Sequence, residues 1–174
     1  MNLRRAQAQD APRLAKIHVD SWQAAYHGIV PDAYLKGFTY QKRETAFRRA
    51  LESGEEETYL LEDNDQDVGI LTIGQCRDAD LDSASIGEIW GIYLSPEYRR
   101  HGIGRRLVKE AEAILHDRGC REVVLWVLED NMEARYFYEA TGYHQDGATK
   151  VTELGKHLNV VRYAKKLADE NFEN

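Results

Sequence analysis

The sequence predicts an α+β fold built on a central mixed sheet, and two observations support this. The hydrophobic period changes along the chain, from strand-like runs to helical spacing after residue 96 and back again. The chain has 174 residues, of which 43% are hydrophobic, which is enough for one sizeable core, and ~150 residues per domain predicts a single domain. We therefore expect one domain over residues 1–167 and a C-terminal tail over 168–174.

The first half of the chain predicts one strand, two helical regions and a hairpin. Asp10 is the expected cap of the first helix, whose apolar positions lead to Tyr26. The second helical region ends near Gly54, and the hairpin has β-branched residues on both sides of a polar turn. In order, the predicted elements are a strand at 2–6, a helix at 10–26, helical segments at 31–38 and 41–53, strands at 57–63 and 68–76, and a strand at 83–95 that stops at Pro96.

The second half predicts two helices and three strands. Ile103, Leu107, Ala111 and Ile114 recur at helical spacing, and Gly119 is a plausible residue just past the end of that helix. The next strand, 121–129, has few polar positions, as expected for a strand buried on both faces. A last helix is expected to start at Asp130, with Glu133 as capping-box partner, and to end at Gly142, before strands near 143–149 and 157–166.

Composition excludes several classes of function. The formal net charge is −7 and the sequence pI is about 5.4, which argues against a nucleic-acid-binding surface and favours a cationic substrate. No run of ~18 apolar residues and no signal-peptide pattern occurs, so we expect a cytoplasmic protein with no membrane partner. Cys76 and Cys120 form neither a disulfide framework nor a cluster with metal-ligand spacing, so no metal is expected.

The stretch "EYRRHGIGRRL", residues 97–107, gathers positive charge and glycine where a strand leads into a helix. Free N–H groups and the helix dipole at such a start hold an anion, and Gly102 and Gly104 allow the backbone to approach it. A pyrophosphate would fit. Neither the GxxxxGK[ST] loop of nucleoside triphosphatases nor the GxGxxG dinucleotide fingerprint is present.

What remains, Arg99-x-x-Gly102-x-Gly104, resembles the acyl-CoA loop of the GCN5-related N-acetyltransferases (GNAT superfamily). The surrounding "EIWGIYLSPEYRRHGIGRRLVKEAEAIL" resembles that family's strand-loop-helix motif. The later "NMEARYFYEATGY" resembles its N-x-x-A-x-x-x-Y-x-x-x-G-(Y/F) motif. The resemblance implies the GNAT fold: about seven mostly antiparallel strands flanked by helices, with a splayed strand pair that binds acyl-CoA.

The resemblance implies acetyl-CoA as co-substrate and assigns its contacts. Backbone groups of the "IYL" strand would meet the pantetheine arm and the acetyl carbonyl, and the arginine loop would cradle the pyrophosphate. Asn131 would hydrogen-bond the pantetheine, although a simple helix cap is an alternative role that can coexist with it. The implied cofactor-binding residues are Ile92, Tyr93, Leu94, Arg99, Arg100, His101, Gly102, Ile103, Gly104, Arg105, Asn131 and Tyr138.

Two catalytic residues are implied. Tyr138 matches the general acid that protonates the departing thiolate of CoA, and the alternative is a core aromatic residue. Glu88 stands where histone-acetylating members carry their catalytic glutamate. On a regular strand it shares a face with Trp90, Ile92 and Leu94. Its alternatives are a strand-end carboxylate paired with an arginine, or a base acting through ordered water.

The expected activity is acetyl transfer to a primary amine by direct attack in a ternary complex. The stretch "SWQAAYHGIVPDAYL" resembles a subgroup that includes polyamine acetyltransferases, so the expected acceptor is a small amine or a polyamine. Trp22, Tyr26, Glu88 and Trp90 are the expected acceptor-binding residues, with packing as the alternative for each tryptophan. The other candidates are a peptide or protein N-terminus or lysine as acceptor, and a non-catalytic acyl-CoA-binding module. A homodimer is possible if the strand at 159–167 lies at a sheet edge.

Overall fold

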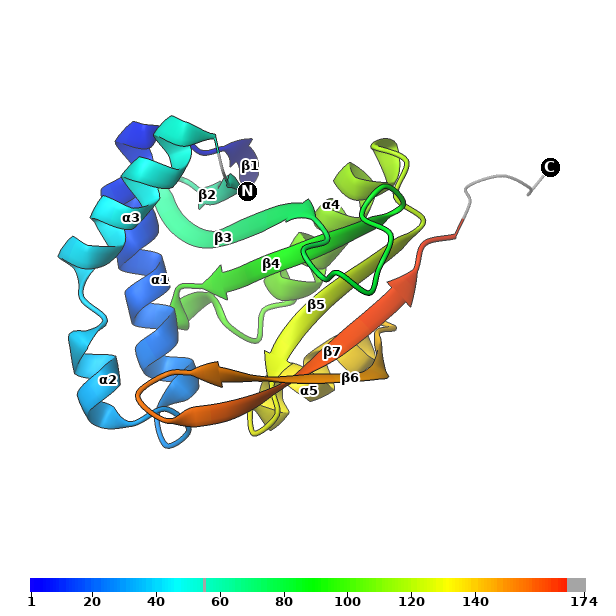
Figure 1. Cartoon of the computed structure of the whole chain (residues 1–174). Helices are drawn as coiled ribbons and strands as arrows, with labels where there is room; N and C mark the ends of the chain where they lie inside the picture. The colour runs from blue at the N-terminus through cyan, green and yellow to red at the C-terminus, as the bar shows by residue number, and fades with distance from the viewer. Residues whose placement is uncertain (55, 169–174) are drawn as a thin grey trace.

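The computed structural model describes residues 1–54 and 56–168, which form a seven-stranded mixed sheet with helices on both faces (Figure 1). Of the expected C-terminal tail, residues 168–174, all but residue 168 lie outside the described residues. The elements are β1 (Asn2–Arg5), α1 (Ala11–Tyr26), α2 (Asp32–Gly37), α3 (Tyr40–Ser53), β2 (Glu57–Asp63), β3 (Gln66–Gln75), β4 (Ile86–Leu94), α4 (Ile103–Asp117), β5 (Glu122–Leu128), α5 (Met132–Ala140), β6 (His144–Glu153) and β7 (His157–Lys166).

The strand order is β1-β2-β3-β4-β5-β7-β6, and every neighbouring pair is antiparallel except β4 and β5. The single parallel pair arises because α4 carries the chain from the end of β4 back to the start of β5. The predicted α+β class and the mostly antiparallel sheet are confirmed. β7, however, lies between β5 and β6, so the expectation that the strand at 159–167 lies at a sheet edge is wrong.

The sheet separates two main apolar clusters. Leu71 and Ile73 of β3 point to the α4 face, where Leu107 and Ala111 pack, whereas Ile70 points to the opposite face, covered by α1 and α3. This alternation follows from the two-residue period of a strand. A smaller third cluster joins the α1–α2 region to the β6–β7 hairpin through residues that include Val30, Leu35, Leu128, Leu158 and Val160.

Local signals fix several element ends. Asn64 and Asp65 both have positive φ (47° and 65°), which gives a two-residue hairpin turn and starts β3 at Gln66, two residues earlier than expected. Asp10 occupies the position before α1, but its carboxylate accepts from the Gln7 N–H and from Arg4 instead of capping that helix. The second helical region is two helices, and β6 runs four residues further than predicted.

No helix in the described part of the chain is both long and apolar enough to span a membrane.

Candidate active site

The main cavity lies where β4 and β5 separate. The two strands pair over only three positions, from Ile86 opposite Glu122 to Glu88 opposite Val124, and then diverge (Figure 1). The cavity between them and the adjoining helices has a volume of about 520 Å³. Its walls come from α1, β4, the loop before α4, the start of α4, β5 and α5. The splayed strand pair expected from the sequence is therefore present.

The register of β4 directs two backbone positions into this gap. The Ser95 N–H donates to the Val68 carbonyl at 3.0 Å, and antiparallel pairs alternate between bonded and non-bonded positions. Ile92 and Leu94 then fall at non-bonded positions opposite Leu71 and Gly69. Their N–H and C=O groups consequently point away from β3, toward the side that β5 has left.

A bulge in β4 changes which side chains share a face. Ile89 and Gly91 pair with the consecutive residues Ile73 and Thr72, so Trp90 is an extra residue in the strand. Beyond the bulge, Ile92 packs on the α4 side with Ile89 instead of on the face of Trp90. The expectation that Glu88 shares a face with Ile92 and Leu94 is therefore wrong.

The loop before α4 is shaped by left-handed backbone at Arg100 (φ 64°) and Gly102 (φ 78°). The first N–H groups of α4 have no acceptor within the helix and are available to an anion. At Gly104 an added Cβ would lie 3.1 Å from the Phe137 ring, so glycine allows the start of α4 to pack closely against that ring of α5. Arg99 and Arg105 line the same end of the cavity.

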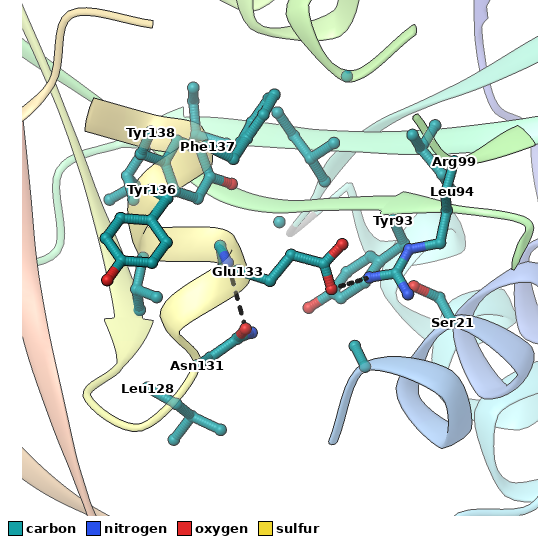
Figure 2. Close-up of a pocket in the computed structure, with 18 of the residues that line it drawn as sticks. Ser21, Tyr93, Leu94, Arg99, Leu128, Asn131, Glu133, Tyr136, Phe137 and Tyr138 are labelled. Carbon is teal, nitrogen blue, oxygen red and sulfur yellow. Dashed lines mark hydrogen bonds and ion pairs between the residues drawn. The ribbon is translucent and has the colours of Figure 1, made fainter. Parts of the chain in front are cut away.

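Glu133 of α5 reaches across this end of the cavity toward the arginines (Figure 2). Its carboxylate lies 3.7 Å from a guanidinium nitrogen of Arg99 and 3.5 Å from one of Arg100. It therefore forms ion pairs and is not the capping-box partner expected from the sequence. An anion already sits beside the positive groups that the sequence assigned to a pyrophosphate.

Asn131 caps α5 and also lines the cavity. Its side-chain oxygen accepts from the Ala134 N–H at 3.2 Å (Figure 2). The helix cap predicted at Asp130 is therefore wrong by one residue, and the capping role foreseen as an alternative for Asn131 is confirmed. Capping uses the side-chain oxygen, and because the carboxamide is planar, the cap also fixes the direction in which the amide nitrogen donates.

Tyr138 lines the cavity from the last turn of α5. Its ring packs edge-on against Phe137, with ring centroids 5.0 Å apart, and burial raises the pKa of its phenol. The hydroxyl therefore stays protonated at neutral pH and is able to donate a proton. Two other tyrosines lie near it in the sequence: Tyr143 is fully buried in the core, and Tyr136 lines the cavity but is 63% exposed.

The opposite end of the cavity is aromatic. All three tryptophans of the chain line it, with Tyr26 and Tyr93 between them. Trp22 stacks on Phe38 at a centroid distance of 4.1 Å and meets Tyr26 edge-on at 4.8 Å. The expected residues Trp22, Tyr26 and Trp90 are thus brought together.

Trp126 on β5 belongs to the same wall and was missed because its strand was expected to be buried on both faces. Its indole N–H donates to Asp78 at 2.9 Å, and Asp78 also accepts from the buried Arg162 at 3.0 Å. Arg162 is further bound by Asp80 and Asp146. This network ties the loop after β3 to β7 and fixes the orientation of the Trp126 indole.

Glu88 is not brought into the cavity. It is 1% exposed and accepts three hydrogen bonds from Arg77: from the backbone N–H at 3.0 Å, from Nε at 3.2 Å and from a terminal nitrogen at 2.6 Å. The Arg77 guanidinium also lies over the Trp90 ring, 4.1 Å from its centroid. The structure favours the alternative of a strand-end carboxylate paired with an arginine.

Two of the expected cofactor-binding residues lie outside the cavity lining. His101 and Ile103 do not line the cavity, and the Ile103 side chain is buried in the core below α4. No group of three or more His, Cys, Asp or Glu side chains that could hold a metal ion occurs among residues 1–54 and 56–168. The lining residues that the sequence did not assign to the site include Ser21, Leu128 and Phe137, as well as Glu133, which was expected only as a capping-box partner.

Comparison with known proteins adds independent information. A model of the acetyltransferase (GNAT) family matches residues 13–143. An N-acetyltransferase of Bacillus subtilis is 31% identical over 141 residues, covering 80% of this chain and 78% of that protein. A probable N-acetyltransferase of Mycobacterium tuberculosis is 30% identical over 152 residues, covering 86% and 83%. A spermidine N(1)-acetyltransferase of Thermoplasma acidophilum is 26% identical over 152 residues, covering 82% and 88%.

Solved structures share the fold. The PaiA N-acetyltransferase of Thermoplasma acidophilum, in complex with coenzyme A, has a TM-score of 0.71 at 22% identity, covering 95% of this chain and 98% of that one. An acetyltransferase of Salmonella typhimurium with acetyl-CoA has a TM-score of 0.68 at 16% identity, covering 100% and 98%. At these identities the likeness concerns the architecture alone.

Proposed function

The chain belongs to the acetyltransferase (GNAT) family and is an N-acetyltransferase that uses acetyl-CoA, and from this premise we propose that it acetylates a small primary amine by direct attack in a ternary complex. The observation that carries the proposal is one continuous cavity with an arginine-rich end and an aromatic end. An elongated, anionic acyl donor fits the first end, and an acceptor fits the second.

The residues at the donor end fit acyl-CoA. Unpaired backbone groups of Ile92 and Leu94 face the gap left by β5, which suits an amide-bearing pantetheine arm that pairs as a strand would. The free N–H groups at the start of α4, together with Arg99, Arg100 and Arg105, suit the pyrophosphate. Asn131 supplies a further polar contact from α5.

Acetyl-CoA supplies an acetyl group on a thioester, which an amine lone pair attacks at the carbonyl carbon. In this proposal the Leu94 N–H, which points into the gap left by β5, would donate to the carbonyl oxygen, where negative charge develops. Tyr138 then donates its phenolic proton to the departing sulfur, and the proton that the acetylated nitrogen loses restores the phenol. Burial raises the pKa of this phenol, so it is protonated at neutral pH. No covalent bond to the protein is required. Cys120 lies at the helix-strand junction after α4 and does not line the cavity.

The acceptor class is the finer part of the proposal. Similarity to a spermidine acetyltransferase makes polyamines a candidate, in line with the resemblance of residues 21–35. A peptide or protein N-terminus or lysine is the second candidate, and it would enter at the aromatic end, whose walls include residues of α1 and β5. A module that binds acyl-CoA without turnover is disfavoured, since the matching relatives are N-acetyltransferases and Tyr138 lines the cavity.

The test is thiol release from acetyl-CoA across a panel of amines: spermidine, simple diamines, aminoglycosides, amino acids and short peptides. Release with a preferred amine supports the proposal and identifies the acceptor class. If acetyl-CoA binds but no amine in the panel releases thiol, the small-amine proposal fails.

A further inference from the structure

We infer that the acceptor enters this cavity as the uncharged amine, so that weakly basic amines, such as the α-amino group of an amino acid or peptide, are preferred over strongly basic alkylamines. The inference rests on the proposed acetyl transfer and concerns the state in which the nucleophile arrives. An ammonium group has no lone pair, so it must lose a proton before it attacks. That proton is lost either to a base in the site, directly or through ordered water, or to bulk water before binding.

The cavity contains one carboxylate, and it lies at the donor end. Among the described residues that line the cavity, Glu133 is the only Asp or Glu, and it is paired with Arg99 and Arg100. The aromatic end therefore has no anionic side chain to bind an ammonium or to take its proton. A wall of indoles and phenols can hold an ammonium group by cation–π contact, but it takes no proton from that group.

Glu88, at the position of the family's catalytic glutamate, is held by a neighbouring cation. Arg77 donates to both of its carboxylate oxygens, and Glu88 is buried outside the cavity lining. Cys76, Asp78 and Glu56 are the other titratable groups that act on this pair, and none of them lines the cavity. Arg77 therefore holds the Glu88 side chain in an ion pair outside the cavity lining.

The remaining titratable groups at the aromatic end are phenols and one imidazole. Tyr26, Tyr93 and Tyr138 line the cavity, and burial raises the pKa of each, so they are protonated and do not accept a proton at neutral pH. His18 packs behind the Tyr93 ring at a centroid distance of 4.2 Å, and burial, with Arg43 nearby, lowers its pKa to about 3. An imidazole with that pKa does not take a proton from an alkylammonium.

The selectivity that follows is set by proton binding in water. An α-amino group with a pKa of ~8 is about one tenth uncharged at pH 7, whereas a lysine-like amine with a pKa of ~10.4 is uncharged in about one molecule in 2,500. If only the free amine binds, the kcat/KM for total amine is raised roughly 200-fold for the α-amino acceptor relative to the lysine-like one at pH 7. At pH 9.5 the same calculation gives a ratio of roughly 10-fold between the two acceptors.

The experiment compares two acceptors with similar carbon skeletons on the wild-type enzyme. Norleucinamide has only an α-amino group, and Nα-acetyl-lysinamide has only an ε-amino group. We measure kcat and the KM for total amine from pH 6.5 to 9.5 at saturating acetyl-CoA. The expected result is a level kcat and a KM that falls about tenfold per pH unit below each acceptor's own pKa. Between pH 7 and 9.5 the ratio of the two kcat/KM values then changes about 20-fold, whatever pH-independent preference the enzyme has for one acceptor over the other.

A KM that stays level while kcat rises at the same pH for both acceptors would overturn the inference, because it would show deprotonation of a bound ammonium by a group of the enzyme. Glu88→Gln identifies that group: an unchanged pH profile is expected, and loss of the rising limb would make Glu88 the base. The wild-type comparison stands even if this variant is unstable. Absence of thiol release with either acceptor, with acetyl-CoA still bound, would instead count against the proposed function.

Discussion

Arg99 and Arg100 border the same end of the cavity but differ in how far water reaches them. The Arg99 side chain is 30% exposed and that of Arg100 is 85% exposed, yet both carry one charge and both lie within 4 Å of Glu133. The substitutions Arg99→Gln and Arg100→Gln remove the same charge and keep most of the side-chain stem. The pair therefore separates the effect of burial from the effect of charge on acyl-CoA affinity.

The expected magnitudes follow from this difference in exposure. A shielded, charge-assisted hydrogen bond to a phosphate contributes about 1.5–3 kcal/mol, so Arg99→Gln should weaken acetyl-CoA binding roughly 10- to 150-fold. A water-exposed ion pair contributes about 0.2–1 kcal/mol, so Arg100→Gln should weaken it by no more than about fivefold. Added salt should reduce the effect of Arg100 more than that of Arg99, since exposed charges are screened first.

The assay is isothermal titration of acetyl-CoA at two ionic strengths, with the KM for acetyl-CoA at saturating acceptor as a second readout. Unfolding temperatures of both variants serve as the control for folding. Equal losses for the two variants, or a larger loss for Arg100→Gln, would refute the argument that Arg99 makes the shielded contact with the pyrophosphate.

Three further predictions concern the acid, the acceptor wall and stability. Tyr138→Phe should lower kcat by about 10²- to 10⁴-fold and leave the acetyl-CoA dissociation constant unchanged; equal kcat would remove this phenol from the mechanism. Gly74→Ala places a Cβ 2.6 Å from the Trp90 ring, so the ring must move and the acceptor KM should rise while acetyl-CoA affinity, measured by titration, stays constant. Hydrogen bonds from Arg4 lower the pKa of Asp10 from 3.8 to about 2, which stabilises the fold by about 2 kcal/mol above pH ~4 and is lost as the pH falls toward 2. Asp10→Asn should therefore lower the free energy of unfolding by that amount at pH 7 and flatten its dependence between pH 4 and 2, as chemical denaturation would show.

The elements of this fold were predictable from the sequence because hydrophobic period and capping residues are local signals. The apolar spacing from Ile103 to Ile114 found α4, and the glycines at 119 and 142 both have the positive φ expected just past a helix end. The arginine-glycine loop and the tyrosine of α5 were located by motif, and both line the cavity.

The relations between elements were harder to predict. The bulge at Trp90 reverses the inward and outward positions of the rest of β4, and its only sequence signal is Gly91 within the strand. Pairing of Glu88 with Arg77 depends on how the loop between β3 and β4 folds back beside the start of β4, and the hydrophobic period of neither strand predicts it. Trp126 faces a cavity only because β5 leaves β4 after Val124, which is a property of the whole sheet.

The short contact between β4 and β5 also affects how folding and binding are linked. Two blocks of sheet, β1–β4 and β5–β7, are joined by three residue pairs, and a donor that occupies the gap between them binds only the folded chain. By mass action, a ligand at 100 times its dissociation constant adds about 2.7 kcal/mol to the free energy of unfolding. Heat denaturation should therefore rank acyl-CoA analogues by affinity before any acceptor is known.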